Sequence, residues 1–383
     1  MSSKTAFQQL FDCSHYVPKN AYTQGVLSRI HHCHSKDLGY HCYQCNNEDC
    51  LHTHFQYHSC GNRHCPFCGT FKKDQWVEQR LADLFPTPYY HIVFTVPHSW
   101  NKVMMQSPGE LYTILFDAAS ETLLGLGKNK DFMGATPGIT AVLHTWGQNL
   151  DYHVHLHCVV SGGGVSNGQW VKAKRSNGKF LFPQAALRKN YKAIFLRLAR
   201  ERKQDIAASD SQIDTAIRIS GFKNWKVYAK APFGGPDQVL KYLGRYTHKT
   251  AITSYRIQAV EEGTVRFSYK DYADGNKTKS MVLNQNEFLR RFEQHILPKR
   301  FVRIRHYGLL TNRGKITRLN QIRENMGLEP VKTIVEAPVA IRMLEKFGKD
   351  ITKCSQCENG RYELLFTKRF GKTTYRRPQK VPV

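Results

Sequence analysis

The feature that most constrains the fold of this chain is a cluster of cysteines and histidines near its start. Eight of the 11 cysteines precede residue 69, and several histidines are interleaved with them. In a chain without secretory features, clustered cysteine and histidine indicate metal binding rather than disulfides. Residues 1–75 also contain few aliphatic runs. We therefore expect a small module over this range that is held together by metal.

Two C-x-x-C pairs stand out in the cluster. They are Cys42 with Cys45 and Cys65 with Cys68, and 19 residues separate them. Each pair offers two thiolates, so together the pairs predict one structural, zinc-ribbon-like Zn²⁺ site. Further potential ligands leave room for a second Zn²⁺ whose ligands the spacing does not assign: Cys33, Cys50, Cys60, His52, His54, His58 and His64. Cys354 and Cys357 form half a site, and both free thiols and a zinc knuckle remain open there.

The charge of the chain indicates a polyanionic partner. Lysine and arginine number 56 against 30 acidic residues, which gives a formal net charge of +26 and a pI near 9.7. Nucleic acid is the partner that this excess favours, because neutralised phosphates release counterions. No apolar run reaches the roughly 18 residues of a membrane-spanning helix, and the first residues lack a secretory signal. We expect a cytoplasmic, nucleoid-associated protein with no membrane partner.

Residues 86–295 carry the pattern of a mixed α and β core. Alternating and β-branched residues predict strands over 88–97, 138–147, 152–164 and 225–233. Apolar residues at helical spacing predict helices over 109–127 and 189–207. A further helix is expected to begin at Pro236, and Asp274-Gly275-Asn276 predicts a hairpin loop. The remainder, 296–383, is a basic C-terminal region.

The segment DYHVHLHCVVSGGG, residues 151–164, contains three histidines at every second position. Side chains alternate between the two faces of a strand, so His153, His155 and His157 share one face and the hydrophobic residues between them share the other. Histidines at i and i+2 can bind one cation together. The alternative is a half-buried strand whose polar face consists of histidine without a ligand.

A second group of residues suggests a nucleophile. In DQVLKYLGRYTH, Tyr242 and Tyr246 are four residues apart, which places them on one face of a helix, and Gln238 lies one turn earlier on that face. Tyrosine can act as a covalent nucleophile when a cation polarises its target. Packing of the two tyrosines in a core is the alternative.

Several segments together resemble a known family. HLHCVV followed by SGGG, then FGGPDQVLKYLGRYTHKTAI, then FVRIRHYGLLTNR, are similar to the rolling-circle transposases of bacterial insertion sequences. These form the two-tyrosine group of the HUH (His, hydrophobic, His) nuclease superfamily. HSCGNRHCPFCG and FTVPHSW are similar to the same group. The resemblance covers residues from about 30 to 320.

The resemblance implies a fold and a site. The implied fold is α+β, with an antiparallel-sheet HUH endonuclease core and flanking helices between the zinc module (1–75) and the basic region (296–383). His155 and His157 take the places of the pair that binds a catalytic Mg²⁺ or Mn²⁺, and Tyr242 and Tyr246 take those of the nucleophiles. The motif does not fix the third metal ligand: Gln238 is the candidate because it shares a helix face with the tyrosines, and His153, His98 and Asp151 stay open.

The implied activity is nicking and rejoining of single-stranded DNA at the ends of a mobile element through a 5′-phosphotyrosine intermediate. Residues of the basic segment are expected to contact the DNA: Arg303, Arg305, His306, Tyr307 and Arg313. A solvated basic face is the alternative for this segment. Two other functions remain open from the sequence: a rolling-circle replication initiator with the same chemistry, and a zinc-ribbon nucleic-acid-binding protein without catalysis.

Overall fold

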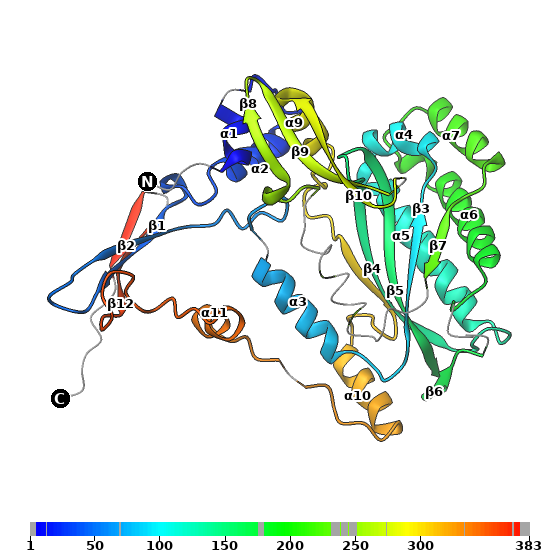
Figure 1. Ribbon diagram of the computed structural model, residues 1–383. Coiled ribbons are helices and arrows are strands. Elements are labelled where there is room, and N and C mark those ends of the chain that lie inside the picture. Colours follow the sequence, from blue (N-terminus) through cyan, green and yellow to red (C-terminus); the bar gives the residue numbers. More distant parts are fainter. Residues whose placement is uncertain are drawn as a thin grey trace.

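A six-stranded antiparallel sheet lies at the centre of the computed structural model (Figure 1). The model describes residues 5–12, 14–68, 70–174, 180–230, 238, 244, 251–272, 274–332, 334–369 and 371–375. The strand order is β11-β4-β5-β3-β7, and β6 pairs with the end of β5. The strands are β3 (Tyr89–Thr95), β4 (Thr136–Trp146), β5 (Tyr152–Ser166), β6 (Gln169–Lys172), β7 (Val227–Lys230) and β11 (Ile304–Gly308).

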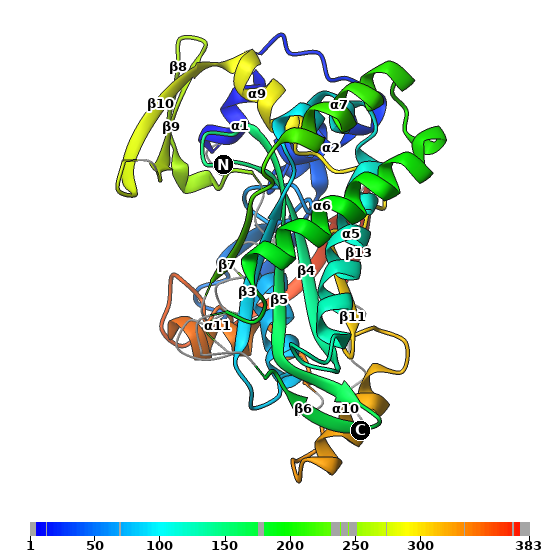
Figure 2. The same cartoon turned by 90° about the vertical axis from the view of Figure 1, so that its right-hand side faces the viewer.

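Four helices cover one face of this sheet (Figure 2). They are α4 (Asn101–Gln106), α5 (Pro108–Lys128), α6 (Gln184–Glu201) and α7 (Asp210–Phe222). Every second residue of the central strands points toward them. From β5 these residues are Val154, Leu156, Cys158 and Val160, all buried in the main hydrophobic core. The period-two pattern of the strand therefore sets which face is apolar and leaves the polar face on the other side.

The expected elements of this core are confirmed where they lie in described residues. The strand over 88–97 is β3 and the helix over 109–127 is α5. The helix over 189–207 is α6, which both begins earlier, at Gln184, and ends earlier, at Glu201. The hairpin is formed by β9 (Thr264–Asp271) and β10 (Lys277–Asn284). Its loop has Gly275 and Asn276 at φ 59° and 64°, a conformation that glycine and asparagine tolerate best. The helix expected at Pro236 begins outside the described residues.

A second, three-stranded sheet in the order β10-β9-β8 packs against the N-terminal helices. Besides β9 and β10 it contains β8 (Ile257–Glu261), and its helices are α1 (Ala6–Asp12), α2 (Ala21–His31) and α9 (Gln285–Glu293). Phe7 of α1 lies 5.0 Å from Phe292 of α9 between ring centroids, in an edge-to-face contact. Residues from the start of the chain therefore share a core with residues near 290.

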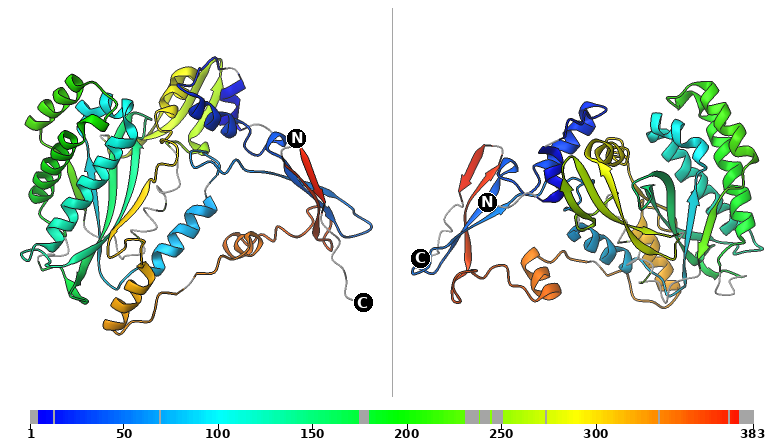
Figure 3. Two further views of the ribbon diagram at one scale, coloured as in Figure 1. Left: turned by 180° about the vertical axis from the view of Figure 1, so that it is seen from behind. Right: turned by 45° about the horizontal axis from the view of Figure 1, so that its top comes forward.

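A third sheet joins the two ends of the chain. Its order is β13-β12-β1-β2, so C-terminal strands pair with N-terminal ones, as Figure 3 shows. The strands are β1 (Tyr40–Cys45), β2 (Thr53–Tyr57), β12 (Tyr362–Arg369) and β13 (Lys372–Tyr375). This sheet pairs strands of the expected region 1–75 with strands of the expected region 296–383. Strand β11, from the region 296–383, in turn belongs to the central sheet, so hydrogen-bonded pairing crosses the expected boundaries at residues 75 and 295.

Helix α3 (Thr70–Ala82) lies on the opposite side of the central sheet from α5 and α6 (Figures 1 and 3). Beyond the central sheet the chain forms α10 (Lys315–Asn325) and α11 (Val339–Phe347). Short 3₁₀ helices span Lys36–Leu38, His98–Trp100, Lys203–Asp205 and Ser254–Arg256. Among the residues that the structure describes, none of the helices has the length and apolarity needed to cross a membrane.

Candidate active site and metal centres

The histidine row lies on the face of the central sheet that α5 and α6 leave uncovered. His153, His155 and His157 belong to β5 and point away from the buried Val154, Leu156 and Cys158. The rings of neighbouring histidines lie close together, with centroids 5.1 Å apart between His153 and His155 and 4.8 Å between His155 and His157. The prediction that these three residues share one strand face is confirmed.

A fourth histidine from the next strand completes a candidate cation site. His144 of β4 lies directly opposite His155 in the antiparallel register. One ring nitrogen each of His144, His155 and His157 lies within 4.8 Å of the others. Three imidazole nitrogens this close can bind one divalent cation. The structure thus brings the predicted pair together with His144, which the sequence analysis did not single out.

Hydrogen bonds fix the orientation of the two histidines on β5. His155 Nδ1 lies 2.9 Å from the carbonyl oxygen of His153, so this nitrogen carries a proton and donates it. His155 Nε2 then keeps its lone pair. His157 Nδ1 lies 2.8 Å from Nε2 of His91 on β3. The nitrogen of His157 that is not engaged with His91 is therefore Nε2. Metal-binding histidines are usually oriented by such a bond from the other ring nitrogen.

Burial keeps these imidazoles neutral near pH 7. It lowers the pKa of His155 to about 4 and the pKa of His157 well below its usual value, and neighbouring histidines lower both further. Burial also lowers the pKa of His91 to about 4. Only the neutral imidazole has a lone pair for a cation, so this electrostatic environment suits metal binding.

Four other residues were considered as a third ligand. His153 and His98 are ring neighbours, with centroids 5.7 Å apart, and neither belongs to the three-histidine group found among the described residues. The carboxylate of Asp151 pairs with Arg291 at 2.9 Å. The ring of His153 also lies 5.1 Å from that of His155, and the roles of His153, His98 and Asp151 stay predictions. The side chain of Gln238 is exposed, and its role stays a prediction.

Tyr242 and Tyr246 lie outside the described residues, so their role stays a prediction. The glycine between them in sequence is described and is buried against α3. A Cβ atom on Gly244 would lie 2.2 Å from Cγ2 of Val77, so this position tolerates no side chain at its present spacing.

Helix α3 faces the same side of the sheet as the histidines. Arg80 of α3 lies 3.4 Å from Nε2 of His306 on β11, and Nδ1 of His306 lies 3.0 Å from the hydroxyl of Thr140. Thr140 is on β4 four residues before His144, hence on the same strand face. Gly244 is therefore held on the histidine side of the sheet.

The cysteines form two clusters rather than the single site predicted. Four sulfur atoms gather in each cluster, all within 4.8 Å of one another. The first cluster consists of Cys33, Cys60, Cys65 and Cys68, and the second of Cys45, Cys50, Cys354 and Cys357. The expectation that the two C-x-x-C pairs share one ion is thus wrong, because Cys45 and Cys65 belong to different clusters.

The position of Cys42 explains the error. Cys42 and Cys45 both lie in the extended strand β1, where three residues span about 10 Å, too far for two ligands of one ion. Cys42 is buried between β12 and β2 and belongs to neither cluster found among the described residues. A C-x-x-C spacing indicates a metal knuckle only where the chain turns, and this chain turns at Cys65–Cys68.

The first cluster fits a structural Zn²⁺ ion. Cys33 Sγ lies 3.5 Å from Cys68 and 3.6 Å from Cys65, and Cys60 lies 3.7 Å from Cys68. Four sulfurs at the usual Zn–S distance of about 2.3 Å form a tetrahedron with edges of roughly 3.8 Å, close to these spacings. His64, one of the possible ligands, instead accepts a hydrogen bond from the backbone N–H of Leu297 at 3.0 Å.

The residues expected to bind DNA differ widely in exposure. Arg303 is only 8% exposed, and burial together with Arg63 lowers its pKa to about 10. Arg305 stacks on Phe116, with its guanidinium carbon 4.4 Å from the ring centroid. His306 and Tyr307 are half-buried in β11, and Arg313 is exposed. Arg303 is thus buried and Arg313 is the most open of the five by burial class, and the DNA-binding role of all five stays a prediction.

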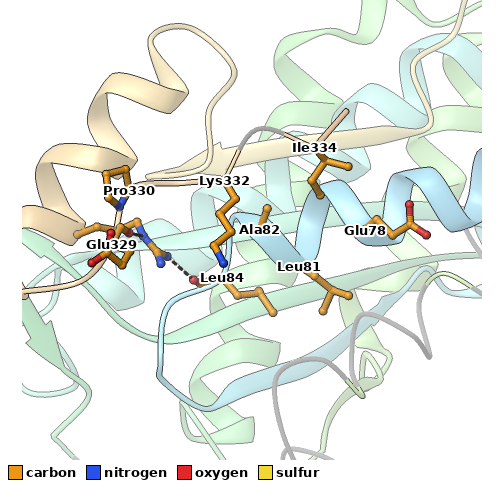
Figure 4. Close-up of a pocket in the computed structure, with 9 residues that line it drawn as sticks. Glu78, Leu81, Ala82, Leu84, Glu329, Pro330, Lys332 and Ile334 are labelled. Carbon is orange, nitrogen blue, oxygen red and sulfur yellow. Dashed lines mark hydrogen bonds between the residues drawn. The ribbon is translucent and has the colours of Figure 1, made fainter. Parts of the chain in front are cut away.

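A pocket of about 370 Å³ lies apart from the histidines, between α3 and the chain that follows α10 (Figure 4). Its wall includes Leu81 and Glu78 of α3, and Pro330 and Ile334 from the later segment. The guanidinium of Arg323 donates a hydrogen bond to the carbonyl of Leu84 at 2.9 Å. The C-terminal part of the chain thus runs along α3.

Comparisons with known proteins identify the family to which this chain belongs. Residues 138–317 match the family described as "Putative transposase", and residues 4–96 match the "Transposase zinc-binding domain". The "Putative transposase y4qJ" of Sinorhizobium fredii is 38% identical over 88% of this chain and 87% of its own length. The transposase for insertion sequence element IS801 of Pseudomonas savastanoi is 28% identical over 87% and 81%.

The chain belongs to this family of two-tyrosine transposases of insertion sequences, which carry an N-terminal zinc-binding domain, as its motifs predicted. Two solved structures of the conjugative relaxase TrwC in complex with oriT DNA, one metal-bound and one copper-bound, each cover 61% of this chain and 96% of their own. Their identities are 11% and 13%, and their TM-scores are 0.26 and 0.24.

Proposed function

We propose that this transposase nicks and rejoins single-stranded DNA at the ends of its element by tyrosine attack, in rolling-circle transposition. The observation that carries the proposal is the group of three imidazole nitrogens within 4.8 Å of one another in a chain of this family. Structural histidines in a core do not need three converging nitrogens, whereas a divalent cation does.

His144, His155 and His157 would hold the cation. When bound, it supplies Lewis acidity that draws electron density from a non-bridging oxygen of the scissile phosphate. His153 and His91 act through the hydrogen bonds that orient His155 and His157. Mn²⁺ suits three imidazoles better than Mg²⁺, which prefers oxygen ligands, and we therefore favour Mn²⁺ of the two.

Tyr242 or Tyr246 would supply the nucleophile. The phenolic oxygen forms a bond to phosphorus as its proton leaves, the bond from phosphorus to the 3′ oxygen breaks, and that oxygen takes up a proton. The products are a 5′-phosphotyrosine link and a free 3′-hydroxyl. Because one phosphoester bond replaces another, rejoining needs no ATP. A second tyrosine could attack a second strand while the first is still linked.

The position of Gly244 supports this assignment. Gly244 lies between the two tyrosines in sequence and is buried against α3, the helix that faces the histidine side of the sheet. Arg313, in the turn after β11, is an exposed cation available to a DNA backbone. The net charge of +26 favours such a partner over any uncharged one.

The proposal is tested with single-stranded oligonucleotides from both flanks of the gene, labelled at the 3′ end. With Mn²⁺ or Mg²⁺, we expect a labelled adduct that survives denaturation and disappears when EDTA is present. The double variant Tyr242→Phe, Tyr246→Phe should form no adduct, and His155→Ala should abolish cleavage with binding largely kept. Tyr255→Phe is the matched control, because Tyr255 is exposed and belongs to a different segment.

Adducts that persist in the double variant would show that other residues act as nucleophiles. A wild-type protein that binds the oligonucleotides but forms no adduct with any divalent cation would point to a nucleic-acid-binding protein without catalysis. Adducts formed only at an origin-like hairpin, and not at the flanks, would favour a replication initiator.

A further inference from the structure

The second cysteine cluster draws its members from opposite ends of the chain. Cys45 and Cys357 are 312 residues apart in sequence, yet their sulfurs lie 3.6 Å apart. Cys50 and Cys354, separated by 304 residues, lie 3.8 Å apart. The zinc-binding domain that the chain matches ends at residue 96, so that match does not cover half of these ligands.

The spacing of the four sulfurs fits a tetrahedral ion and not disulfides. A disulfide requires sulfurs about 2.05 Å apart, whereas a Zn²⁺ tetrahedron has edges of roughly 3.8 Å. The backbone N–H of Asn47 donates to the sulfur of Cys45, and that of Gln356 donates to the sulfur of Cys354, each at 3.4 Å. Donors aimed at sulfur stabilise the thiolate form, which is the form that binds metal.

Gly360 shows how closely the chain wraps this cluster. A Cβ atom at residue 360 would lie 2.1 Å from the sulfur of Cys45 and 2.8 Å from that of Cys357. The backbone therefore contacts the sulfurs directly, and solvent is excluded from that side. A closed site with four thiolates is typical of structural zinc rather than catalytic zinc, which keeps an open position.

The polypeptide leading to the cluster is otherwise held by a few polar contacts. After the pocket of Figure 4, buried Arg342 of α11 pairs with Glu78 of α3 at 3.0 Å, and Lys346 pairs with Asp74 at 2.9 Å. Exposed apolar residues of α11, such as Leu344 and Phe347, add little burial. The pair of Lys346 with Asp74 is partly exposed and contributes about 0–1 kcal/mol, and Glu78, the partner of buried Arg342, is itself 39% exposed, so these pairs alone hold the segment weakly.

We propose that Cys45, Cys50, Cys354 and Cys357 bind a second structural zinc ion that fastens the C-terminal segment to the N-terminal module. The ion cross-links β1, and the turn after it, to the turn before β12, and so supports the pairing of β12 with β1. This site is independent of the DNA cleavage proposed above. If experiments disprove the second zinc site, the proposed DNA cleavage by tyrosine attack is unaffected.

Metal content of the full-length protein tests the stoichiometry. Wild type should contain two zinc ions per chain, and the double variant Cys354→Ser, Cys357→Ser should contain one. Cys42→Ser is the matched control, since Cys42 is buried in the same strand as Cys45 but belongs to no cluster of the described residues, and it should keep two. One zinc in wild type, unchanged in the double variant, would overturn the proposal.

A cobalt titration of wild type covers the case in which the double variant fails to fold. Thiolate-to-Co²⁺ absorption should rise linearly to two equivalents, and saturation at one would also overturn the second site.

The fastening role has its own measurement. A protease site is placed at 335–338, where Val335 is 85% exposed, and the cut protein is passed over a sizing column. The C-terminal fragment should co-elute with the rest in the parent protein and separate in the cysteine double variant. Co-elution in both would show that the strand pairing and ion pairs suffice without the ion.

Discussion

Replacing Gly244 with alanine should weaken both stability and DNA cleavage, and the structure gives a magnitude. The new Cβ would lie 2.2 Å from Cγ2 of Val77, whereas ordinary contact begins near 3.4 Å. The segment and α3 would have to separate by about 1.2 Å, and overpacking of this kind costs roughly 1–3 kcal/mol. Alanine gains up to about 1 kcal/mol over glycine in a helix. We therefore expect a net loss of about 1–2 kcal/mol in the free energy of unfolding.

A second substitution makes this prediction specific. Val77→Ala removes the methyl group that the new Cβ would meet, so the double variant should recover most of the activity that Gly244→Ala loses. Urea unfolding of all four proteins gives a coupling energy, which we expect to be favourable by about 1–2 kcal/mol. The activity assay is adduct formation on 3′-labelled oligonucleotides. Equal activity and stability in Gly244→Ala and wild type, or a coupling energy of zero, would refute the packing of residue 244 on α3.

Three further predictions concern the histidines. His144→Ala should abolish metal-dependent cleavage in the oligonucleotide assay, whereas His153→Ala should cause a smaller loss; equal effects would argue against His144 as the third ligand. His91→Ala should weaken Mn²⁺ binding by roughly 10–100-fold in calorimetry, because His157 loses its orienting hydrogen bond; unchanged affinity would contradict that role. Burial lowers the pKa of His295 from 6.5 to about 4, so the unfolded chain binds the proton first and stability falls as pH drops from about 6.5 to 4. This contribution is about 3 kcal/mol, and His295→Gln should flatten that part of the pH dependence of urea unfolding; an unchanged slope would contradict it.

The sequence predicted the central sheet well because its strands have a strict period of two. His155 and His157 could be placed on one face without knowing any other strand. His144 was missed because it lies on a neighbouring strand, and pairing register is not a local property. Counting outward from the pair Trp146 and Tyr152 brings residue 144 opposite 154, and only the register shift between residues 144 and 146 brings it opposite His155.

The cysteine clusters depend even more on contacts between residues that are far apart in the sequence. The C-x-x-C spacing at Cys65 and Cys68 predicted a knuckle correctly, but the same spacing at Cys42 and Cys45 lies in a strand. No local pattern reveals that Cys357 returns to Cys45, because that contact spans 312 residues. The net positive charge of the chain likewise indicated the class of partner, but it did not show which basic residues are accessible to that partner, since Arg303 is buried.

The position of helix α3 links the first cysteine cluster to the surface that contacts Gly244. It starts two residues after Cys68, contacts His306 through Arg80, and leads into β3. Thirteen helical residues form a rod of about 20 Å, and tilting such a rod by about 5° moves its far end by roughly 2 Å. A change in the angle between α3 and the first cysteine cluster would therefore shift Val77, and with it the surface that Gly244 contacts.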